Sequence, residues 1–148
     1  MNPGFQTKNF RVATQDGQNF VLLEDVLYLA KDGTLYVLPV GMTTDGASTP
    51  AMIWLNFPPF GSYWKAAVLH DAAYRDTLMV VVNDTRTYAS VTEQLANELL
   101  LEAMELLGTH EFTRQAIYDG VCLGGRSSFE MDRKQGRAAF MVYITEAL

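Results

Sequence analysis

The chain has 148 residues, of which 49% are hydrophobic and 19% charged, with a net charge of -6 and a pI near 4.8. This length and balance are typical of a folded globular protein and exclude a disordered tail, so we expect a single domain over residues 1–148. The 11 Lys and Arg residues are scattered, which argues against a nucleic-acid partner, and no apolar run is long enough to span a membrane.

The first forty residues predict an antiparallel β meander. Residues typical of strands are concentrated in segments 10–13, 20–29 and 35–40, and the turn signals at 16–17 and 31–33 separate them.

Segment 41–61 is rich in glycine and proline, which predicts a loop with one short helical turn around 51–55. A long loop inside a compact domain is usually functional.

Helices are expected to dominate the rest of the chain. The first should begin at the N-cap Ser62 and run to Arg75. A small hairpin over 78–89 follows as an excursion between two helices. The fold class is therefore α+β, with a meander followed by about three helices and an inserted hairpin.

The second predicted helix begins at a capping box formed by Ser90 and Glu93 and ends at Gly108. The third spans 111–123 and stops at the glycine pair 124–125, while segment 137–148 fits a strand and a helix equally.

The N-terminus lacks the charged and apolar segments of a signal peptide, so we expect a soluble protein with no transmembrane segment. The lone cysteine, Cys122, excludes an internal disulfide and a cysteine zinc cluster. Because its neighbours are apolar, we expect Cys122 in the core.

His70 is the first candidate for chemistry. Small residues flank it at helical spacing, so we expect it to be buried and to need a polar partner, for which Asn97 on the inward side of the next helix is the candidate. Asp71 is turned about 100° from His70 around the helix and should face the 41–61 loop. His70, Asp71 and Asn97 are thus catalytic candidates, and the alternative is a structural core histidine.

The loop itself supplies oxygen-bearing side chains. Asp45 and Asp71 could share a Ca²⁺ or Mg²⁺ ion, because these cations take oxygen ligands. Thr44, Ser48 and Tyr74 are candidates for orienting a substrate or the local structure. Equally, loop Asp, Ser and Thr side chains make turns and cap helices.

Zinc is poorly supported, because the other histidine, His110, is expected at the surface or capping a helix start.

Several segments together resemble a family of tailed phages and prophages, domain of unknown function family 1353. They are the strand at 20–28, the phrase VGMTTDGASTP at 40–50, Trp54, and the helix AVLHDAAYR at 67–75. The resemblance covers roughly residues 20 to 125. That family usually places Ala-Asp early in the next helix, where this chain has Ala96-Asn97.

HDAAY at 70–74 is also similar to the His-Asp-x-x-Tyr helix of secreted and viral phospholipases A2. In those enzymes the histidine activates water, the aspartate binds Ca²⁺ with a glycine-rich loop, and a carboxylate on an antiparallel helix holds the histidine. This chain reproduces neither that loop nor the cysteines of those enzymes, so the similarity is an analogy.

These resemblances imply a phage-derived virion or assembly component, associated with a tail, neck or capsid, with other phage structural proteins as partners and the virion or the host cytoplasm as its location. The alternative is a hydrolase, with or without the assistance of a metal ion, in which His70 is the general base. A third hypothesis is a small acidic protein that binds and blocks a host factor.

Overall fold

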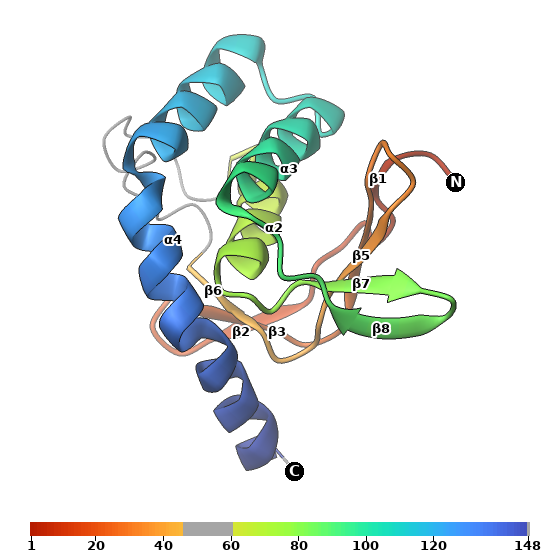
Figure 1. Cartoon of the computed structure of the whole chain (residues 1–148), viewed down its shortest axis with the longest axis vertical. Helices are drawn as coiled ribbons and strands as arrows, with labels where there is room; N and C mark the ends of the chain where they lie inside the picture. The colour runs from red at the N-terminus through yellow and green to blue at the C-terminus, as the bar shows by residue number, and fades with distance from the viewer. Residues whose placement is uncertain (46–60, 148) are drawn as a thin grey trace.

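The computed structural model describes residues 1–45 and 61–147 (Figure 1). Its strands are β1 (Gly4–Phe5), β2 (Val12–Thr14), β3 (Phe20–Leu22), β4 (Val26–Leu29), β5 (Leu35–Leu38), β6 (Thr43–Thr44), β7 (Met79–Val82) and β8 (Thr85–Tyr88). Its helices are α2 (Trp64–Tyr74), α3 (Glu93–Leu106) and α4 (Glu111–Ala147). The predicted α+β class, with antiparallel strands before a helical part, is confirmed.

The strands form two antiparallel sheets, one of order β1-β4-β5-β7-β8 and one of order β2-β3-β6. Segment 20–29, predicted as one strand, is divided between them: β3 belongs to the small sheet and β4 to the large one. The break falls at Asp25, whose carboxylate accepts the Val40 N–H at 2.8 Å. Aspartate is disfavoured inside strands because its side chain competes for backbone donors in this way.

The predicted hairpin is present as β7 and β8, and its turn residues Asn83 and Asp84 both have positive φ, 51° and 62°. It is not an excursion, however. β7 pairs with β5, with Tyr36 opposite Val80, so the hairpin extends the large sheet. Strands β1 and β6 were not predicted, because two residues carry no readable alternation.

The helix starts differ from the predicted caps. α2 is preceded by Tyr63 rather than Ser62, and no side chain caps it. The N-cap of α3 is Thr92, whose hydroxyl accepts the Leu95 N–H at 3.1 Å. Ser90 has a φ of 49°, a left-handed turn conformation, instead of the extended one that an N-cap requires.

The end of α3 agrees with the sequence. Gly108 has a φ of 78°, its N–H is bonded to Glu105, and the next N–H, of Thr109, reaches back to Met104 at 2.9 Å. This is the Schellman arrangement for which glycine is preferred, because it carries no Cβ.

The predicted stop at residues 124–125 is wrong, since α4 continues to Ala147 and segment 137–147 is helical. A Cβ on Gly125 would lie 2.5 Å from the Tyr74 hydroxyl oxygen. The glycine is therefore required for the close approach of α4 to α2, and packing outweighs its poor helix propensity, about 1 kcal/mol relative to alanine.

The core is built from buried residues of both sheets and of α2, α3 and α4, and α3 and α4 pack against α2. Every residue of α2 from Ala66 to Tyr74 is buried, which the small side chains at 66, 67, 72 and 73 permit. The described core residues of α2 and α3 are Ala66, Ala67, Val68, Leu69, Ala72, Ala73, Tyr74, Ala96, Leu99, Leu100, Ala103 and Met104. No helix in the described ranges is both long and apolar enough to cross a membrane.

Candidate functional site

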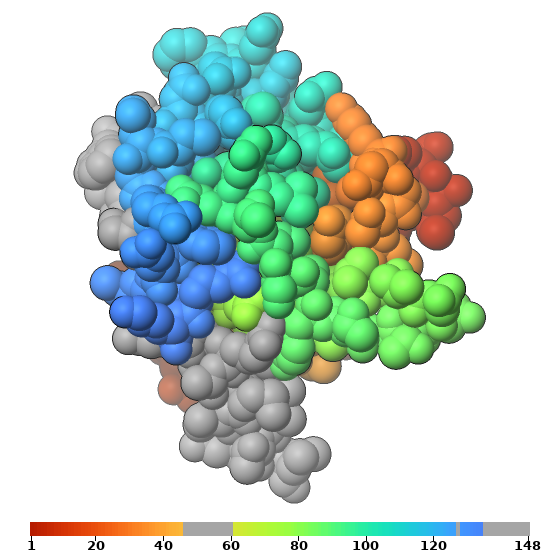
Figure 2. All heavy atoms as spheres, in the orientation of Figure 1, coloured from red at the N-terminus to blue at the C-terminus, as the bar shows by residue number. Residues whose placement is uncertain are grey.

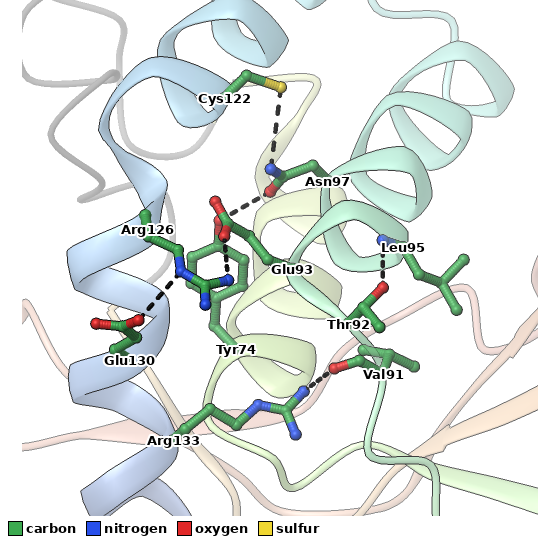
Figure 3. A network of polar contacts seen from close by, with 10 residues as sticks. All are labelled: Tyr74, Val91, Thr92, Glu93, Leu95, Asn97, Cys122, Arg126, Glu130 and Arg133. Carbon is green, nitrogen blue, oxygen red and sulfur yellow. Dashed lines mark hydrogen bonds and ion pairs between the residues drawn. The ribbon is translucent and has the colours of Figure 1, made fainter.

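His70 lies at the contact between α2 and α3. It is 2% exposed, and its Nε2 is 2.8 Å from Asn97 Oδ1, to which the Tyr74 hydroxyl also donates at 2.8 Å (Figure 3 shows the Tyr74–Asn97 bond). Because an amide oxygen only accepts hydrogen bonds, His70 must donate to it, so in the neutral imidazole Nε2 carries the hydrogen and Nδ1 the lone pair. The centroid of the Tyr74 ring lies 4.0 Å from that of the imidazole.

Burial lowers the pKa of His70 to about 4, although the hydrogen bond to Asn97 and the negative charge of Asp45 act in the opposite direction. A charged imidazolium loses its hydration in this environment, and a neutral amide compensates little of that loss. His70 is therefore neutral around pH 7.

Asp71 faces away from this pair, toward β6. It is 6% exposed, and the Thr44 hydroxyl donates to its Oδ2 at 2.5 Å. Burial raises the pKa of Asp71 well above its ordinary value, and the nearby charge of Asp45 raises it further, while Arg75 and Thr44 act to lower it. The carboxyl group thus holds its proton to higher pH than an exposed aspartate.

Arg75 supplies the positive charge at this cluster. Its guanidinium lies 3.8 Å from Asp45 Oδ2 and donates to the Thr43 carbonyl at 2.8 Å, so it joins the end of α2 to β6. Asp132 of α4 is influenced by the same charges. Half-burial has the largest effect and raises the pKa of Asp132, while the charge of Arg75 lowers this pKa and the charge of Asp45 raises it.

Two of these residues were not predicted from the sequence. Arg75 stands four residues after Asp71 on one helix, which places both on the same face and was a readable signal. Asp132 had no such signal, because the third helix was predicted to end before it.

The structure thus divides the predicted site residues into two groups. His70, Tyr74 and Asn97 form one, and Thr44, Asp45 and Asp71 form the other, while Ser48 lies outside the described residues. Within residues 1–45 and 61–147, no three His, Cys, Asp or Glu side chains come together as metal ligands.

Cys122 is exposed and not in the core as predicted. Its neighbour Val121 belongs to the core, whereas the next residue, Leu123, is 87% exposed. The Cys122 sulfur is 3.9 Å from Asn97 Nδ2, where α3 and α4 adjoin (Figure 3).

His110 is exposed, as expected, and its Nδ1 accepts the Phe112 N–H at 3.2 Å, which caps the start of α4.

The match to a known family covers most of these elements. The family model described as "Protein of unknown function (DUF1353)" matches residues 20–121. This chain belongs to the DUF1353 family. The region shared with DUF1353 runs from β3 into α4 and includes His70, Asp71 and Asn97. Searches of curated proteins and of solved structures gave no significant match.

Proposed function

We propose that this DUF1353 protein is a phage-derived virion or assembly component, associated with a tail, neck or capsid, in which the His70–Asp71 centre is a structural polar network. The observation that carries the proposal is that His70 is 2% exposed and hydrogen-bonded to an amide, Asn97.

A general base works best with a pKa near the operating pH, and burial lowers the pKa of His70 to about 4. Asn97 cannot stabilise an imidazolium as a carboxylate would. What the network does accomplish is attachment: His70 and Tyr74 join α2 to α3, and Asp71 joins α2 to β6 through Thr44. Buried hydrogen-bonded contacts of this kind favour one packing arrangement over others.

The surface of α4 supports a role in assembly. Phe112, Leu123 and Met131 are 74%, 87% and 62% exposed, respectively. We propose these side chains of α4 as contacts with other phage structural proteins.

The test is sedimentation of particles from cells that produce the phage, followed by detection of this chain. We expect the chain in the particle peak after a high-salt wash, and a chain found wholly at the top of the gradient would contradict the proposal. A phage carrying Asn97→Leu should incorporate less of the chain, while Gln94→Ala, an exposed change on the same helix, serves as the matched control.

A second candidate is a hydrolase, which the orientation of His70 favours. Its Nε2 is fixed as the donor to Asn97, which leaves the lone pair on Nδ1, the atom that would take the proton from water. Asp71 and Asp45 lie on the neighbouring side, where two carboxylates offer oxygen ligands to Ca²⁺ or Mg²⁺. Carboxylic esters are the substrate class, in line with the resemblance to the phospholipase A2 helix.

This candidate predicts that Asn97→Asp, which places a carboxylate behind the imidazole, raises the pKa of His70 and increases ester hydrolysis, whereas His70→Gln abolishes it. Ca²⁺ or Mg²⁺ should raise the Tm of the wild type but not that of Asp71→Asn. An unchanged wild-type Tm would exclude the metal-assisted version, and an inactive Asn97→Asp variant that remains folded would argue for the structural role.

A further inference from the structure

Helices α3 and α4 border a cleft that neither proposed function uses. Its volume is about 410 Å³, in the range of small-molecule sites, and its lining includes Glu93, Gln94, Asn97, Tyr118, Cys122 and Arg126. In Figure 2 the surfaces of α3 and α4 adjoin on the face shown, and Figure 3 shows side chains from both helices meeting there. Asn97 lines it, with its amide oxygen bonded to His70 and its amide nitrogen facing Cys122, another lining residue.

We propose that this cleft binds a small molecule through a carboxylate group. The first argument is the amide nitrogen of Asn97. Asn97 is 4% exposed, and its oxygen is occupied by His70 and Tyr74. Within the described residues, its Nδ2 has only the Cys122 sulfur, at 3.9 Å, as a partner. A thiol is a weak acceptor, so a buried donor directed into the cleft lacks a strong one.

The second argument is the charge at the mouth of the cleft. The Arg126 guanidinium is 3.2 Å from Glu93 and 3.1 Å from Glu130 (Figure 3). Its side chain is 72% exposed, so both pairs are weak and screened by solvent, and the guanidinium can turn toward a carboxylate in the cleft. Bidentate binding of carboxylates is the interaction for which arginine is best suited.

The third argument is the hydroxyl of Tyr118, a residue that lines the same cleft. Together with Asn97 Nδ2 and Arg126, it gives three donors from two helices around one space. Glu93 and Glu130 are the opposing charges beside Arg126, and therefore Arg126 is the residue on which selectivity for an anion depends.

Cys122 makes the proposal testable, because it is the only cysteine of the chain, so alkylation of a thiol reports on this cleft alone. Iodoacetate and iodoacetamide both react when the thiolate forms a C–S bond and iodide leaves with the C–I electron pair; the thiol proton goes to solvent. They differ in carrying a carboxylate or a neutral amide. The rates are measured by intact mass, and the ratio of the two rates cancels differences in thiol reactivity.

We expect the iodoacetate-to-iodoacetamide ratio to be roughly fivefold higher in the wild type than in Arg126→Gln, the factor that a unit charge about 4 Å away gives in water. The matched control is Lys134→Gln, which removes an exposed cation of the same helix outside the cleft and should leave the ratio unchanged. An excess of acetate, but not of acetamide, should slow alkylation by iodoacetamide.

Three results would each overturn the proposal. The first is an equal iodoacetate-to-iodoacetamide ratio in the wild type and in Arg126→Gln, and the second is a ratio that falls as much in Lys134→Gln as in Arg126→Gln. The third is that acetate does not slow alkylation. Arg126 is largely exposed, and a far-ultraviolet circular dichroism spectrum shows whether its variant is folded. The result does not depend on whether the chain is a virion component or a hydrolase.

Discussion

Acidification from pH 7 to pH 4.5 is expected to destabilise this protein through His70. The unfolded chain binds a proton at this imidazole with an ordinary pKa of 6.5, whereas burial lowers the pKa in the folded protein to about 4. The folded state therefore resists protonation, and stability is lost as the pH falls through this window.

The two pKa values give the magnitude. Between pH 7 and pH 4.5 the unfolded imidazole becomes almost fully charged while the folded one remains mostly neutral, which corresponds to about 2 kcal/mol of lost stability. This is a large fraction of the total stability of a domain of this size.

The assay is urea denaturation at several pH values for the wild type and for His70→Gln, which cannot titrate at this position. The difference in unfolding free energy between the two proteins should shrink by about 2 kcal/mol from pH 7 to pH 4.5. Comparing the two proteins removes the contributions of carboxylates that both share. A constant difference over the whole range would refute the assignment of His70 as a buried neutral imidazole.

Two further predictions concern the same network. Gly125→Ala should destabilise the protein by roughly 1–3 kcal/mol in urea denaturation, because the new Cβ would lie 2.5 Å from the Tyr74 hydroxyl oxygen. In a Tyr74→Phe background, which lacks this oxygen, the cost of the substitution should vanish. An equal cost in both backgrounds would show that the hydroxyl is not the obstacle. Asp71→Asn should stabilise the protein more at pH 8 than at pH 5. The pKa of Asp71 is raised in the folded protein, so the contribution of the protonated carboxyl group to stability is lost as the pH rises through that pKa, whereas asparagine does not titrate. Equal Tm changes at both pH values would contradict this reading.

The main contacts of the site could be predicted from helix geometry alone. Asn97 was identified as the partner of His70 because it lies on the inward side of an amphipathic helix, and their atoms are 2.8 Å apart. Asp71 was expected about 100° around the helix, and it faces β6 and Thr44. Their catalytic and structural roles remain predictions.

Other features depend on contacts between distant segments, which local patterns do not contain. Gly125 was read as a helix stop, because glycine ends helices more often than it makes room for a neighbouring tyrosine. That error removed Asp132 from consideration and left Cys122 near a supposed helix end, where its apolar neighbours suggested burial. Asp25 divided an apparently continuous strand through a bond to the distant Val40 backbone.

The most direct test of the structural role of His70 is a titration of its imidazole by NMR, with the nitrogen shifts reporting both charge and tautomer. A sealed structural histidine should remain neutral, with hydrogen on Nε2, from pH 8 to pH 5, and titrate at a pKa of about 4. A midpoint near the ordinary value of 6.5 would show that solvent reaches the ring, and it would contradict the structural account in favour of a working base.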